Sequence, residues 1–292
     1  MQKIIYFAQL LKFRLSITVV FSAVCGYILA SDELNSYILT NLILGGFLVV
    51  GSANTFNQIL ERNYDGLMER TKDRPLPRNN LGIYEATFFG LTIGIFGIYL
   101  LYLINPYCSY YGISSILLYA LCYTPLKRMS PISIFVGAIP GAIPYLLGWV
   151  AAYPEEQGFQ MDSGILFAIQ FFWQFPHFIA IAWVQHEDYK RAGFKMMIGG
   201  EKGSKSVIVS IVSSILLMTV SILPFFLFES NLNFSIVGIA ICLLINLIFI
   251  MKSVNLLIKQ DDVSAKKLMI YSFIYLPMIQ LLLIIDKHFI MI

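Results

Sequence analysis

The chain has 292 residues, of which 58% are hydrophobic and only 13% are charged. Soluble domains carry about 25% charged residues, so this composition excludes an ordinary soluble protein. The formal net charge of +3 gives no reason to expect a nucleic-acid partner, and the four cysteines lack the spacing of a zinc site or a disulfide framework.

Apolar stretches of about 17–25 residues recur along the whole chain, and each is long enough to cross a hydrocarbon core of about 30 Å. The sequence therefore predicts an all-α polytopic membrane protein that forms one domain over residues 1–292, with about nine transmembrane helices. In chain order, the predicted spans are residues 15–31, 37–57, 85–104, 108–124, 131–152, 163–184, 206–228, 233–251 and 268–286.

Lysine and arginine residues are concentrated in alternate loops, whereas the intervening loops are short or acidic. By the positive-inside rule, the amino terminus and two long basic loops, residues 58–84 and 185–206, are expected on the cytoplasmic side. Each of these loops opens with carboxylates at the end of a helix. The sequence therefore predicts two pseudo-repeated halves whose motif loops face each other across the bundle.

The end of the second predicted span carries Asn57, Glu61 and Asp65 at intervals of four residues, with Asn54 just before them. Side chains at i, i+4 and i+8 on a helix turn by only about 40° per step, so they share one face. Their oxygen atoms suit Mg²⁺, which is usually completed by water and substrate phosphates. A solvated loop that only follows the topology rule is the alternative. Cations that suit phosphate oxygens follow at once: Arg70, Lys72, Arg74 and Arg78.

Two further cytoplasmic motifs are candidates for the same site. Tyr123 and Lys127 stand where the fourth helix is predicted to stop, at Pro125, with Arg128 beside them. In one interpretation these side chains bind diphosphate oxygens. In the other, the cations Lys127 and Arg128 only anchor the helix end at the membrane surface. Asp188, in the second motif loop, would supply another carboxylate to the metal, although such a loop by itself is also typical of solvated segments.

The sixth predicted span contains the segment W-Q-F-P-H-F, which includes Pro176 and His177. A histidine inside an apolar membrane helix is a functional-site candidate. Pro176 is expected to kink the helix and to free a backbone carbonyl nearby. His177 could ligate a haem iron, pair with an acidic group, or form a hydrogen bond to a neighbouring carbonyl.

Together these motifs resemble the protohaem IX farnesyltransferase family, a branch of the UbiA-type intramembrane prenyltransferases. The resemblance rests on five segments: N-Q-x-x-E-x-x-x-D, M-E-R-T-K-D-R-P-L, Y-T-P-L-K-R, W-Q-F-P-H-F and E-D-Y-K-R-A-G-x-x-M-M. It implies a bundle around a central cavity that opens to lipid. The implied reaction is the Mg²⁺-dependent transfer of a farnesyl group from farnesyl diphosphate to a vinyl group of haem B, which gives haem O.

The resemblance also implies a role for each matching residue. Metal binding falls to Asn57, Glu61, Asp65 and Asp188, which count as catalytic residues together with Lys127. Diphosphate binding falls to Asn54, Arg70, Lys72, Arg74, Tyr123 and Arg128. His177 matches a histidine expected near the porphyrin. The expected location is a bacterial-type inner membrane, where a haem A synthase or a terminal oxidase assembly would be a partner.

Five positions depart from the family pattern. Glu61 replaces an aspartate of many relatives, and Asp73 replaces an asparagine. Ser133 and Tyr145 replace an asparagine and a proline in the fifth helix, and Ala192 replaces the later aspartate of quinone-type relatives.

Two alternative functions stay open. An aromatic prenyltransferase of quinone biosynthesis would use the same donor chemistry, but the W-Q-F-P-H-F segment and Ala192 favour haem as the acceptor. An ion-coupled transporter would place its carboxylates near the bilayer midplane, and not beside a basic cluster at cytoplasmic helix ends.

Overall fold

The computed structural model describes residues 2–153, 160–227, 230, 232 and 235–290. All regular elements within these residues are helical, which confirms the predicted all-α membrane protein. Eight of the described helices are long and apolar enough to cross a membrane. They are α2 (Phe13–Ala30), α3 (Ser36–Asp65), α4 (Ile83–Tyr102), α7 (Ser133–Ala152), α8 (Met161–Val184), α10 (Ser204–Ile222), α11 (Ile236–Lys259) and α12 (Asp262–Ile285).

The predicted fourth span is not a single α-helix. It is a continuous helical segment of three parts, namely α5 (Pro106–Leu117), the π-helix η1 (Leu118–Tyr123) and α6 (Thr124–Met129). The helix does not stop at Pro125 as predicted. Pro125 follows directly on the π-helical turn of η1, and the backbone keeps helical angles through Tyr123 and Thr124 into α6. Both η1 and α6 contact α3, so this segment delivers Lys127 to the helix that carries the first acidic motif.

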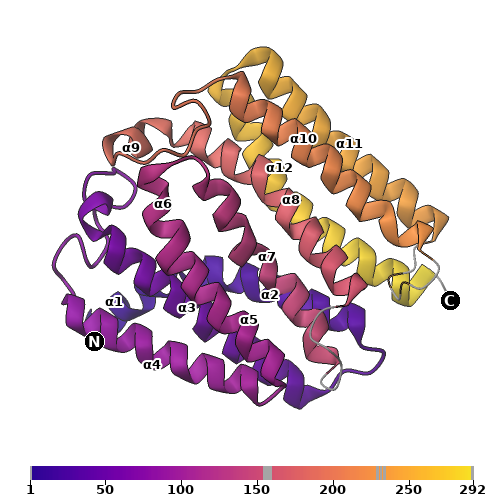
Figure 1. Ribbon diagram of the computed structural model, residues 1–292, viewed down its shortest axis with the longest axis horizontal. Coiled ribbons are helices and arrows are strands. Elements are labelled where there is room, and N and C mark those ends of the chain that lie inside the picture. The colour runs from indigo at the N-terminus through magenta and orange to yellow at the C-terminus, as the bar shows by residue number, and fades with distance from the viewer. Residues whose placement is uncertain (1, 154–159, 228–229, 231, 233–234, 291–292) are drawn as a thin grey trace.

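The long helices lie side by side, with α2 to α5 on the side of α7, and α10 to α12 on the side of α8 (Figure 1). α7 packs against both α2 and α8 and is the most deeply buried of the spanning helices. Its contact with α2 requires glycine, since a Cβ on Gly148 would collide with the backbone of Ala23. Small residues allow two membrane helices to approach this closely. α12 also contacts α2, so the first and last spanning helices are neighbours.

α3 is longer than its predicted span, because it continues past residue 57 to Asp65. Asn35 caps the other end by accepting hydrogen bonds from two backbone N–H groups. The first acidic motif is therefore helical throughout. The turn that follows α3 lies with α6 and the short helix α9 (His186–Arg191) at one end of the bundle (Figure 1).

Other helix boundaries differ modestly from those predicted. α12 begins before residue 268, because the Asp261 side chain caps it by accepting from the Ser264 N–H at 2.7 Å. The predicted boundaries at residues 228 and 233 lie outside the described residues. A short helix, α1 (Gln2–Leu10), precedes α2.

Candidate active site

The oxygen-bearing face of α3 is buried. Asn57, Glu61 and Asp65 follow one another by single turns of α3, and their exposed fractions are 2%, 5% and 0%. Asn54 lies on the same helix and is also buried. Buried carboxylates are costly unless each has a partner or a ligand, so the partners of these side chains indicate what the face can bind.

Asp65 has one engaged and one unengaged carboxylate oxygen. Its Oδ2 accepts a hydrogen bond from the Arg74 guanidinium at 2.8 Å, and its backbone carbonyl accepts from the Thr71 hydroxyl at 2.9 Å. Its Oδ1 is buried and has no hydrogen-bond partner. A buried oxygen of this kind needs a ligand, and a carboxylate oxygen is a preferred ligand of Mg²⁺.

Glu61 forms an ion pair with Lys127 of α6. The Lys127 ammonium also lies 4.9 Å from the ring centroid of Tyr123 and 5.2 Å from that of Phe194, so two aromatic rings flank it. The predicted Tyr123–Lys127 motif is thus placed directly against the carboxylate face of α3.

Lys12 belongs to the same cluster, although none of the sequence motifs includes it. Its Nζ donates to Asn57 Oδ1 at 3.1 Å, and the Asn57 amide in turn donates to the Thr124 hydroxyl at 3.1 Å. Lys12 lies in the turn before α2, with a left-handed backbone conformation (φ 47°). Burial lowers the pKa of Lys12 to about 7, and the positive charge of Arg74 adds to this shift.

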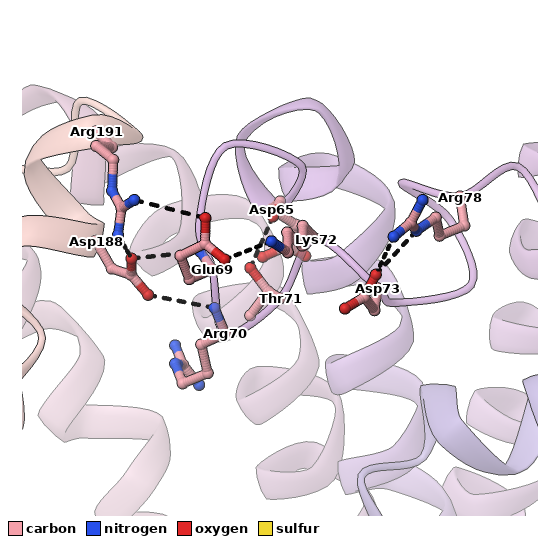
Figure 2. Close-up of polar contacts among 9 residues, drawn as sticks. All are labelled: Asp65, Glu69, Arg70, Thr71, Lys72, Asp73, Arg78, Asp188 and Arg191. Carbon is pink, nitrogen blue, oxygen red and sulfur yellow. Dashed lines mark hydrogen bonds and ion pairs between the residues drawn. The ribbon is translucent and has the colours of Figure 1, made fainter.

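The second acidic motif meets the first through the backbone. The two carboxylate oxygens of Asp188 accept from the backbone N–H groups of Glu69 and Arg70, each at 3.3 Å, and Asp188 also pairs with Arg191 (Figure 2). The two motif loops are therefore in contact through these hydrogen bonds. Asp188 does not join the α3 carboxylates, however, since no group of three His, Cys, Asp or Glu side chains among the described residues is arranged to hold a metal.

The remaining predicted phosphate-binding cations differ in their partners. Lys72 pairs with Glu69, and the Arg128 guanidinium lies 4.0 Å from the ring centroid of Tyr64. In the part of the chain that the structure describes, the Arg70 guanidinium has no ion-pair partner, and no dashed line reaches it in Figure 2. Arg70 is thus the predicted cation that is most open to an added anion.

His177 of α8 is buried, at 8% exposure. Its Nδ1 lies 2.8 Å from the Ser272 hydroxyl, and its ring stacks on Trp173 at a centroid distance of 4.6 Å. Among the described residues His177 contacts no acidic group, which is one of the three partners considered for it, and its Nδ1 instead meets a hydroxyl. Its ring also contacts Phe178 at 5.8 Å, and Phe178 stacks on Tyr123 at 6.4 Å. This row of rings connects His177 with the charged cluster.

Comparisons with known proteins identify a family and named relatives. The model of the UbiA prenyltransferase family matches residues 19–276. The chain is 42% identical over 281 residues to a protein named Protoheme IX farnesyltransferase from Christiangramia forsetii, covering 96% of this chain and 93% of the relative. It is also 42% identical over 284 residues to a protein of the same name from Flavobacterium psychrophilum, covering 96% and 94%.

Solved structures share the fold. One, from work on digeranylgeranylglyceryl phosphate synthase, superposes with a TM-score of 0.82 at 22% identity, over 98% of this chain and 99% of that chain. A UbiA homologue from Archaeoglobus fulgidus, bound to DMAPP and Mg²⁺, gives a TM-score of 0.68 at 15% identity, over 93% and 99%. With the family match spanning most of its length, the chain belongs to the UbiA prenyltransferase family.

Proposed function

We propose that this protein transfers the farnesyl group of farnesyl diphosphate to a vinyl group of haem B and so makes haem O. The observation that carries the proposal is the 42% identity, across 96% of the chain, to proteins named Protoheme IX farnesyltransferase. The geometry supports it, because buried carboxylates and cations lie together and a row of rings connects them with His177. Nothing favours the quinone alternative, and family membership excludes the transporter.

The carboxylate face of α3 fits a divalent cation. Asp65 offers a buried oxygen without a partner, Glu61 a second carboxylate, and Asn57 an amide oxygen. A UbiA homologue binds Mg²⁺ together with a prenyl diphosphate. We expect these three side chains to hold Mg²⁺, which would supply positive charge to the diphosphate leaving group. For Asp188, the fourth predicted ligand, we propose another role. Its carboxylate accepts a hydrogen bond from the Glu69 N–H and so supports the turn there.

The cations of the cluster are proposed to bind the leaving group. Arg74 and Lys127 neutralise Asp65 and Glu61 in the structure, and a diphosphate bound beside these carboxylates would share the same two cations. Arg70, whose guanidinium is open, would contact the diphosphate directly. Fixed positive charge stabilises the negative charge that develops as the carbon–oxygen bond breaks, an effect that is usually large in a site shielded from water.

The acceptor, haem B, is proposed to lie near His177, at the end of the row of rings that runs from Tyr123 through Phe178. Cleavage of the donor leaves an allylic cation, which the electron-rich vinyl group of haem attacks. Water then adds to the new cation and releases a proton, so the product gains both a farnesyl group and a hydroxyl. Phe178 and Tyr123, packed between His177 and Lys127, would shield the first cation from early hydrolysis.

The described helices and the family match make the protein an integral, multi-pass membrane protein. We propose that its amino terminus and its charged cluster lie on the cytoplasmic side of a bacterial-type inner membrane. The alternation of basic loops along the chain supports this orientation. A complex with a haem A synthase or a terminal oxidase assembly stays a prediction.

A direct assay tests the proposed reaction. Purified protein is incubated with haem B, farnesyl diphosphate and Mg²⁺, and the haem fraction is analysed by mass spectrometry. The expected product is heavier than haem B by one farnesyl group and one hydroxyl group. Transfer to 4-hydroxybenzoate in a parallel reaction, with haem left unchanged, would overturn the proposal in favour of the quinone branch.

A further inference from the structure

We propose that Ser272 of α12 is a positioning residue that fixes His177 in a single tautomer, with Nδ1 protonated and Nε2 available to bind the iron of haem B. The inference rests on the proposed function and deepens it, because it assigns the histidine a ligand role and names the residue that prepares it. Neither residue carries a charged partner among the described residues.

The proton count at Ser272 fixes the tautomer. Its hydroxyl has one proton, which it donates to the Met269 carbonyl at 2.6 Å. The Ser272 oxygen therefore acts as the acceptor in its 2.8 Å contact with His177 Nδ1, and the imidazole supplies the proton. His177 is buried and has no acidic partner among the described residues, so it is neutral and holds only one N–H. Its Nε2 consequently carries a lone pair.

The orientation of the ring is fixed by aromatic neighbours. The Trp173 indole N–H donates to the backbone carbonyl of Ser272 at 2.9 Å, and the indole lies nearly parallel to the imidazole, at 20°. Phe273 meets the imidazole edge-on, at 4.8 Å and 87°. Ser272 thus holds both the imidazole and the indole that covers one of its faces, and the ring has little freedom to rotate.

A histidine that served only in packing would be expected to have both nitrogens satisfied. No hydrogen-bond partner for Nε2 of His177 is present in the described residues, whereas the other buried histidine, His186, uses its Nε2 to contact Glu201 at 2.9 Å. A hydrogen bond from Nδ1–H, with Nε2 left open, is the arrangement by which metal-binding histidines are usually oriented. His177 also connects to the charged cluster through Phe178, which places an iron ligand on the acceptor side.

Haem spectroscopy on the full-length protein in detergent tests this inference. Haem B is titrated in the absence of farnesyl diphosphate, and the Soret band and the electron paramagnetic resonance spectrum report axial ligation. His177→Ala is expected to abolish the histidine-ligated spectrum. Ser272→Ala is expected to shift it and to weaken haem binding by about 10- to 100-fold, as loss of the partner that orients a metal ligand usually does. Ser272→Thr retains the hydroxyl and is expected to restore the wild-type spectrum.

Matched variants separate positioning from packing. Ser264→Ala, at another buried serine of α12, is expected to leave the haem spectrum unchanged. Should Ser272→Ala not fold, Ser272→Cys keeps the volume with a weak acceptor and is expected to show the same spectral shift. Wild-type spectra and haem affinity in folded Ser272→Ala or Ser272→Cys would overturn the inference. If the wild type forms haem O and the Ser272 variants show wild-type haem spectra, only the role of Ser272 is wrong. If it forms none, the proposed function fails.

Discussion

The two acidic motifs look equivalent in sequence but are used differently in the structure. Asp65 of the first motif pairs with the side chain of Arg74 and keeps one buried oxygen without a partner. Asp188 of the second motif directs its two oxygens to the backbone N–H groups of Glu69 and Arg70 (Figure 2). The first carboxylate is prepared for a ligand, and the second joins the two halves of the chain.

The two carboxylates differ in how many of their oxygen atoms have a hydrogen-bond partner. Backbone N–H groups and a guanidinium satisfy Asp188 fully, so this residue stabilises the turn after α3 without any added ion. Asp65 bears an unpaired buried oxygen, which is costly unless a ligand is bound. Carboxylate spacing in a sequence cannot distinguish these two cases, because both place an acid at a cytoplasmic helix end.

The largest effect is expected for Asp65→Asn, which keeps the shape of the side chain and removes its charge. Loss of one group that stabilises developing charge costs about 100- to 1,000-fold in turnover, so farnesyl transfer should nearly vanish. The measurement is haem O formation at saturating Mg²⁺. Asp73→Asn is the matched control, because Asp73 is exposed in the segment that follows α3 and its ion-pair partner among the described residues is Arg78. Wild-type turnover in Asp65→Asn would contradict the metal assignment.

Lys127→Met is expected to reduce both stability and turnover, because it leaves Glu61 buried without its ion pair. Removing one partner of a buried pair costs about 3–5 kcal/mol, which should lower the midpoint of thermal unfolding clearly. The double variant Glu61→Gln/Lys127→Met separates the two roles. It should recover the midpoint but not the turnover, and recovery of turnover would show that the pair is only structural.

Asp188→Asn tests the comparison itself. The variant keeps one oxygen as an acceptor and loses the charge, so a charged hydrogen bond of about 1.5–3 kcal/mol becomes a neutral one of about 0.5–1.5 kcal/mol. The difference of about 1.4 kcal/mol corresponds to a roughly tenfold fall in turnover. Hydrogen exchange at the Glu69 and Arg70 amides should become faster, while the Mg²⁺ concentration for half-maximal activity stays at the wild-type value. A rise in that concentration like the one expected for Asp65→Asn would make Asp188 a metal ligand.

Much of the fold could be predicted from the sequence, because the length of apolar stretches is set by the bilayer. The helical spacing from Asn57 to Asp65 also predicts their common face, since side-chain direction in a helix is a local property. The partners could not be predicted. Lys12 meets Asn57 from 45 residues away and Asp188 meets Glu69 from 119 residues away, and such contacts depend on how the helices pack.

The smallest effect is a pH dependence that originates at Lys12, which belongs to neither acidic motif. With a pKa of about 7, its amine is protonated below neutral pH and loses its charge as the pH rises. Affinity for Mg²⁺–pyrophosphate should therefore fall above pH 7, by less than about tenfold in total between pH 6 and pH 9. Calorimetric titration from pH 6 to pH 9 measures this slope. Lys12→Arg stays protonated and should flatten it. Identical slopes in the two proteins would place the titrating group elsewhere, leaving Lys12 with only its contact to Asn57.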